Sequence, residues 1–106
     1  MSQRNLSWER LHRTERLRFR DAHGKRWLLQ VYAHHSERAH WLVKMPPHPT
    51  RADHLMEGTR PTLTDAKVHA MGRVLAEVER GGCPVGRRLR LRLEHLMAML
   101  ALGGGE

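Results

Sequence analysis

Residues 16–33 read RLRFRDAHGKRWLLQVYA, and the fold prediction starts from this stretch. Leu17 and Phe19 alternate with arginines, which is the period-two pattern of a strand with one buried face. Residues 21–24 are turn formers, and the glycine among them can adopt a positive φ. Residues 27–33 return to apolar alternation, so the stretch predicts two antiparallel strands joined by a tight turn.

A third strand is predicted at residues 39–44, AHWLVK, which are rich in aromatic and β-branched side chains. Together the three segments predict an antiparallel sheet over about residues 16–45. Prolines within residues 46–49 end the last strand, because proline cannot continue a regular element there. Residues 46–61 are then expected to form a long connection, with a short turn of helix at Ala52–Met56.

Residues 63–80 carry the clearest helical pattern, since their apolar side chains recur on one arc of a 3.6-residue period. Thr62 with Asp65, or Thr64 alone, offers an N-cap, Asp65 suits the first turn, and two following glycines end the helix. Residues 87–102 fit either a strand or a helix. Their length and helix-forming composition favour a helix over about residues 87–101.

The fold class expected is α+β, with a three-stranded antiparallel sheet packed by the 63–80 helix and the C-terminal helix beside it. A short helix carrying Leu6, Trp8 and Leu11 is also predicted within residues 1–15. The core is expected to contain Leu17, Phe19, Trp27, Leu29, Val31, Val43, Met71, Leu75 and Val78.

Length and composition favour a single domain over residues 1–106, because 106 residues with 40% apolar content suit one modest core. Cys83 is the only cysteine, and it is expected in an exposed turn. The absence of an intrachain disulfide suits a reducing cytoplasm. No hydrophobic signal region and no apolar run of roughly 18 residues is present, so a cytoplasmic protein without membrane contact is expected.

The formal net charge is +8, and most of the positive charge lies in two segments. Residues 1–26 hold eight Lys or Arg against three Asp or Glu, and residues 80–92 hold five against none. Residues 27–79 are balanced, with six of each sign. Such a distribution favours a polyanionic partner, either nucleic acid or an acidic protein. The alternative is a solvated charge run that serves only solubility.

The leading hypothesis is a small, non-enzymatic protein that binds nucleic acid, DNA or RNA. If the first strand and the last helix meet in space, their arginines form one surface for phosphate contacts. The predicted nucleic-acid-binding residues are Arg16, Arg18, Arg20, Lys25, Arg26, Arg87, Arg88, Arg90 and Arg92.

The second hypothesis is a protein-interaction module, such as a small phage- or plasmid-type inhibitor or adaptor that docks on an acidic protein or nucleoprotein. Leu91, Met99 and Leu102 fall outside the main apolar arc of the last helix, which predicts a second buried face and a possible homodimer. Tyr32 is expected opposite Trp27, as an exposed aromatic platform for a partner or for a stacked base.

No catalytic or metal-binding pattern emerges from the sequence. No phosphate-binding glycine loop, nucleophile elbow or carboxylate pair is present, so neither an enzyme nor a cofactor is expected. His34, His35 and His40 form the only local histidine cluster, and adjacent strand residues point to opposite faces. No metal site is therefore expected.

The predicted order of a helix, three strands and a helix resembles the double-stranded-RNA-binding domain. The run Asp65–Ala70, with Gly58 upstream, is similar to that family's basic Ala-Lys helix start. The positions of the family's phosphate-binding lysines fall on Thr62–Asp65, which are neutral or acidic. The order also resembles arm-binding domains of phage integrases. The resemblance implies an α+β architecture, and nucleic-acid binding by analogy.

Overall fold

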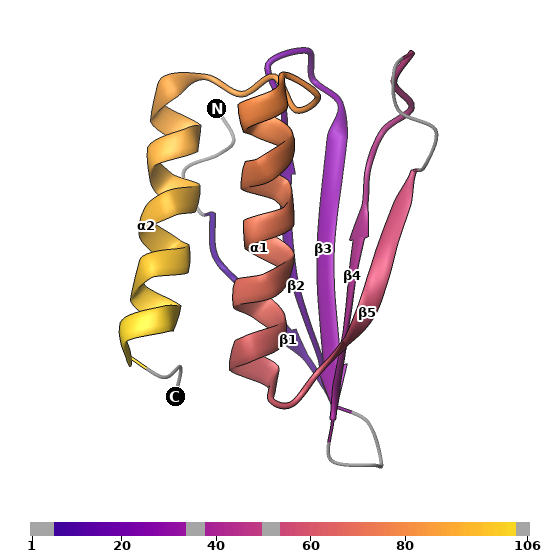
Figure 1. Ribbon diagram of the computed structural model, residues 1–106, viewed down its shortest axis with the longest axis vertical. Helices are drawn as coiled ribbons and strands as arrows, with labels where there is room; N and C mark the ends of the chain where they lie inside the picture. Colours follow the sequence, from indigo (N-terminus) through magenta and orange to yellow (C-terminus); the bar gives the residue numbers. More distant parts are fainter. Residues whose placement is uncertain (1–5, 34–37, 50–53, 104–106) are drawn as a thin grey trace.

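The computed structural model describes residues 6–33, 38–49 and 54–103, which form an α+β fold (Figure 1). The expected class is confirmed. The sheet, however, has five antiparallel strands in sequential order rather than three. The elements are β1 Glu9–Leu11, β2 Thr14–Arg20, β3 Arg26–Ala33, β4 Ala39–Lys44, β5 Leu55–Arg60, α1 Leu63–Arg80 and α2 Arg87–Gly103.

The first additional strand, β1, replaces the short helix predicted near the N-terminus. Residues 9–11 pair with β2, and Leu11 lies opposite Thr14 across a two-residue turn in which His12 adopts a positive φ of 57°. The helix prediction was therefore wrong for Leu6, Trp8 and Leu11, and residues 1–5 lie outside the described residues. The element order behind the resemblance to double-stranded-RNA-binding domains is not the observed order.

The second additional strand, β5, occupies part of the predicted long connection. It pairs with β4, and Gly58 lies opposite Trp41. A Cβ at Gly58 would lie 3.0 Å from Trp41 Nε1, so glycine gives the indole room to pack across the strand. The turn of helix predicted at Ala52–Met56 was wrong at residues 55–56, and residues 52–53 lie outside the described part.

The three central strands follow the predicted alternation. Over residues 17–20, 26–32 and 39–44 every second residue is buried, and Leu17, Leu29 and Val43 have no exposed surface. All nine predicted core residues pack in the hydrophobic core, with Leu75 and Val78 only partly buried. The core also contains Trp41 and these residues that were not predicted for it: Ala39, Met45, Ala66, Ala70, Val74, Cys83 and Leu93.

Both helices lie on the same side of the sheet (Figure 1). α1 begins and ends as predicted: Thr62 Oγ1 accepts a hydrogen bond from Asp65 N at 3.0 Å, and Gly81 is left-handed with φ of 84°. α2 is a helix, as predicted, and packs against α1 through its buried Leu93. No helix or strand of the described residues covers the opposite side of the sheet, which we call the open face.

The loop between the helices, residues 81–86, is anchored by Cys83. This residue is 1% exposed, so its expected place in an exposed turn was wrong. Its backbone N–H donates to the carbonyl oxygen of Glu77 at 3.2 Å, as does that of Gly82 at 2.9 Å. These bonds satisfy the end of α1 and direct the chain back toward the start of α2.

The turn between β2 and β3 is organised by the carboxylate of Asp21, which is only 7% exposed. Its Oδ1 accepts hydrogen bonds from the backbone N–H groups of His23 (2.9 Å) and Lys25 (3.0 Å). Its Oδ2 accepts a third from Trp27 Nε1 at 3.1 Å. The next residue, Ala22, donates its N–H to the carbonyl oxygen of Pro84 at 2.6 Å. The turn is thereby tied to loop 81–86.

We predict that Asp21→Ala lowers the free energy of unfolding by about 2–4 kcal/mol, since a buried indole N–H and two backbone N–H groups lose their acceptor. Asp21→Asn should lose less, because its amide oxygen can still accept. Urea unfolding measures both. Glu57→Ala, at an exposed strand position, is the control, and an equal loss in that variant would contradict the role assigned to Asp21.

Candidate functional site

The arginines of β2 line one side of the open face. Because Leu17 and Phe19 point into the core, the intervening Arg16, Arg18 and Arg20 point away from the helices, as the sequence predicted. Arg20 lies opposite Arg26 of β3. The four arginines surround a hollow with these further lining residues: Ser7, Glu9, Phe19, Trp27, Leu28, Lys44 and Met45.

Two of these residues, Lys44 and Glu9, were missed at the sequence level. Lys44 lies opposite Leu28 and adds a cation to the hollow. The alternation of β4 carries the signal for it, since Lys44 falls on the face opposite Val43. Lys25, which was predicted as a contact, is exposed in the β2–β3 turn beside the hollow.

Glu9 is the acid within this cluster. Its Oε1 lies 3.2 Å from Arg16 Nε and 3.2 Å from Arg18 Nη2. The hydrogen bond from Arg16 and the positive charge of Arg18 hold the pKa of the Glu9 carboxyl below its ordinary value. Glu9 therefore stays ionised and offsets part of the charge of two arginines. Finding it required strand β1, which the sequence did not predict.

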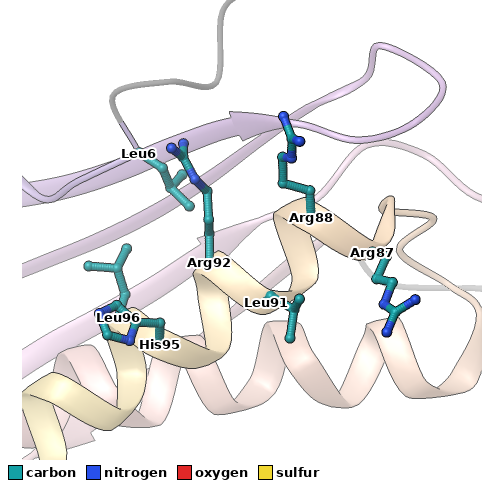
Figure 2. A pocket seen from close by; sticks show the side chains of 7 residues that line it. All are labelled: Leu6, Arg87, Arg88, Leu91, Arg92, His95 and Leu96. Carbon is teal, nitrogen blue, oxygen red and sulfur yellow. The ribbon is translucent and has the colours of Figure 1, made fainter.

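The arginines at the start of α2 line a second hollow, shown in Figure 2. Arg88 and Arg92 extend from the same side of the helix, while Arg87 extends in another direction. Leu6 and Leu96 are among the apolar residues that line the hollow.

Arg90, predicted as a nucleic-acid contact, does not line this hollow. Its guanidinium forms an ion pair with Glu79 of α1, and its Nε lies 3.1 Å from Oε2 of Glu94 one turn along α2. Arg90 therefore links α2 to α1 and to its own next turn.

The two basic clusters lie at the same end of the molecule. The turn that joins Arg20 to Arg26 is hydrogen-bonded to Pro84, which precedes Arg87 by three residues. The turn and the start of α2 are both at the upper end in Figure 1. We call this region the basic end, and define it as Arg18, Arg20, Lys25, Arg26, Lys44, Arg87, Arg88 and Arg92.

The N-terminal segment connects the two hollows. Leu6 lines the α2 hollow and the adjacent Ser7 lines the sheet hollow, so the hollows adjoin at one peptide unit. The segment is held by Trp8, whose ring lies 5.6 Å from Lys67 Nζ. Lys67 itself pairs with Glu15 Oε1 at 2.5 Å. This lysine, part of the run that resembled an RNA-binding helix start, therefore joins α1 to β2.

Several cations of the basic end have no acidic partner among residues 6–33, 38–49 and 54–103. They are Lys25, Arg26, Lys44, Arg87 and Arg88. A concentrated positive potential is expected at this end, because unpaired like charges on neighbouring elements add their fields.

The predicted partner-binding residues lie on the open face and on α2, where Leu91 also lines the α2 hollow. Tyr32 lies on the open face but is partly buried rather than exposed, and its ring centroid is 4.9 Å from that of His40. Leu91, Met99 and Leu102 are exposed on α2 by 55%, 58% and 88%. They form an apolar stripe on the side of the helix turned away from the core.

The histidines show no arrangement for metal binding in the described part of the chain, where no three His, Cys, Asp or Glu side chains cluster suitably. His34 and His35 lie outside that part. His69 packs on Trp41, with ring centroids 4.7 Å apart. Burial lowers the pKa of His69, and the charges of Arg60 and Arg73 lower it further. His69 is therefore a neutral packing residue near pH 7.

Across the residues described, no helix combines the length and the apolar character needed to cross a membrane. Comparison with protein-family models, with curated proteins and with solved structures finds no match to this chain.

We predict that the Glu9 carboxyl titrates below its ordinary value of 4.5, because both of its arginine partners favour the ionised form. As the pH falls through this lowered pKa, Glu9 loses its charge and releases Arg16 and Arg18. Replacing both arginines with Gln should raise the pKa toward 4.5, as followed by carboxyl NMR shifts. The control is Arg20→Gln with Arg26→Gln. An equal rise of the Glu9 pKa in the control variant would mean that the overall positive charge of the protein, and not the contacts with Arg16 and Arg18, sets this pKa.

Proposed function

We propose that this protein is a small, non-enzymatic nucleic-acid-binding protein whose basic end contacts phosphates. The observation that carries the proposal is the meeting of two distant arginine clusters at one end of the fold, through the Ala22–Pro84 hydrogen bond. Arginine suits this role because its planar guanidinium donates two parallel hydrogen bonds to phosphate oxygens.

The charge at the start of α2 supports the same proposal. A helix N-terminus carries a partial positive charge, so arginines in the first turn oppose the macrodipole and cost some stability. The first turn of α2 contains Arg87 and Arg88 and no acidic residue. Arg90 has acidic partners on α1 and α2, so packing accounts for that residue. Phosphate binding gives Arg87 and Arg88 a use.

Glu9 reduces the positive charge of the sheet hollow but leaves cations there that a phosphate can contact. It neutralises part of Arg16 and Arg18, whereas Arg26 and Lys44 on the neighbouring strands have no acidic partner among the described residues. A phosphate group approaching the sheet hollow would meet these two cations first. It would compete with Glu9 only for contacts on β2.

We predict that the protein binds short DNA or RNA with an affinity that falls steeply with salt, because each phosphate contact releases condensed counterions. Replacing Arg87, Arg88 and Arg92 together with Gln should flatten the log–log salt slope by about 2–3 units. Fluorescence anisotropy at several salt concentrations measures the slope. Replacing Arg18, Arg26 and Lys44 together with Gln should flatten the salt slope by the same amount.

The matched control removes three charges from the opposite end of the molecule, in the variant with Arg10, Arg13 and Arg38 replaced by Gln. These residues lie by the β1–β2 turn and at the start of β4, away from the basic end. The control should keep most of the slope. If it loses as much as the basic-end variants, only the net charge matters, and no binding at low salt would refute the proposal.

A second candidate function, self-association, is favoured by the exposed apolar stripe on α2. Leu91, Met99 and Leu102 together present a surface that a folded monomer leaves in water. Since Arg87, Arg88 and Arg92 occupy the first half of α2, an antiparallel pairing of two α2 helices keeps the two arginine sets apart. The basic ends would then lie at opposite ends of a homodimer.

We predict that replacing Met99 and Leu102 with Gln converts such a dimer to a monomer, because each loses apolar area that pairing would bury. Light scattering coupled to size exclusion gives the mass. Leu11→Gln, at a 44%-exposed apolar residue of β1, is the control and should leave the mass unchanged. A monomeric mass for the unaltered protein at about 100 μM would contradict self-association; dimers weaker than roughly millimolar contribute little.

A further inference from the structure

We infer that the ligand is a single-stranded nucleic acid that lies along β3 on the open face, with bases over Tyr32 and phosphates at the basic end. This inference rests on the proposed function and specifies its substrate. The inferred site includes apolar and aromatic residues of the sheet, which have no role in binding the phosphates of a duplex.

The strand registers define the composition of the open face. One row across the sheet is Arg18, Leu28, Lys44 and Leu55, and the next is Arg16, Gln30, Leu42 and Glu57. The third row is Thr14, Tyr32, His40 and Thr59. Net positive charge is therefore concentrated at one end of the face, Leu28, Leu42 and Leu55 lie among the charged and polar side chains of the first two rows, and the third row carries the aromatic rings.

The leucines of the first two rows favour single strands over duplexes. Leu28 and Leu42 are half-buried although no helix or strand of the described residues covers them, and Leu55 is 43% exposed. A duplex presents mainly phosphates to a flat surface, because its bases are stacked and paired inside. An unpaired strand exposes its bases, so apolar and aromatic side chains contribute to its binding.

The far end offers an aromatic surface. The rings of Tyr32 and His40 lie 4.9 Å apart and are tilted by 37°, and His40 Nε2 is 3.1 Å from Glu57 Oε1. The contacts of His40 fix the orientation of the ring beside Tyr32. Base stacking on aromatic side chains is worth about 1–3 kcal/mol per base and accepts any sequence.

The dimensions and charges suit a short strand. Arg26 and Tyr32 are six residues apart on β3, which is about 20 Å at the usual rise of a strand. Single-strand sites begin at about four nucleotides, so one such segment can reach both ends. Glu57 lies beside the aromatic end and repels phosphates there. The charge distribution therefore favours phosphates at the basic end and bases at Tyr32.

The test compares a 12-nucleotide single strand, as DNA and as RNA, with the duplex of the same sequence, for the unaltered protein and for Tyr32→Leu. Tyr32→Leu keeps apolar bulk but removes the ring, so affinity for the single strands should fall by about tenfold or more. Duplex affinity should not change. Tyr32→Phe keeps the ring and should retain single-strand affinity. Circular dichroism confirms that both variants are folded.

The outcomes separate this inference from the proposed function. Tighter binding of single strands together with a selective loss in Tyr32→Leu supports it. If the duplex binds as tightly as the single strands, or if Tyr32→Leu binds both unchanged, the inference is wrong while phosphate binding at the basic end stands. If no nucleic acid binds at low salt, the proposed function itself fails.

Discussion

The carboxylate of Asp21 is enclosed at the end of the β2–β3 hairpin, where it accepts hydrogen bonds from two backbone N–H groups and from the indole of Trp27. A turn held in this way has one shape, so the adjacent N–H of Ala22 meets the carbonyl oxygen of Pro84. That contact fixes the hairpin against the loop before α2. The distribution of positive charge depends on it, because Arg20 and Arg26 flank the turn and Arg87 follows the loop.

The sequence predicted the elements that bury one face in the core and leave the other face toward solvent. In β2 to β4 the alternation is nearly ideal, since α1 covers one face and solvent meets the other. α1 carries its own cap and stop signals, so its bounds at Leu63 and Arg80 were predictable. The edge strands were not. β1 has three residues, all exposed, and β5 alternates only between exposed and half-buried positions, so neither shows an apolar period.

The arginines of the candidate site were predictable from the sequence, but Lys44, Glu9 and the way the two clusters meet were not. Counting charges identified both arginine clusters. No local sequence pattern predicts that residues 18–26 and 87–92 lie close together, because their proximity depends on a long-range backbone contact. Nor did the sequence separate Arg90 from its neighbours. Nothing in the sequence distinguishes the four α2 arginines from one another, and only the packing of α2 on α1 brings Glu79 close to Arg90.

The uneven coverage of the sheet links the fold to its proposed use. Two helices suffice for one face, and Trp27, Trp41 and Leu93 complete the core on that side. On the open face, apolar Leu28 and Leu42 still bury part of their surface against neighbouring side chains. Their remaining apolar area represents free energy of about 25 cal/mol for each Å² that a ligand covers. A strand with unpaired bases can cover this area, whereas phosphates can only neutralise the charge beside it. Under the proposed function, the same face would provide affinity through its arginines and preference among nucleic acids through its leucines and Tyr32.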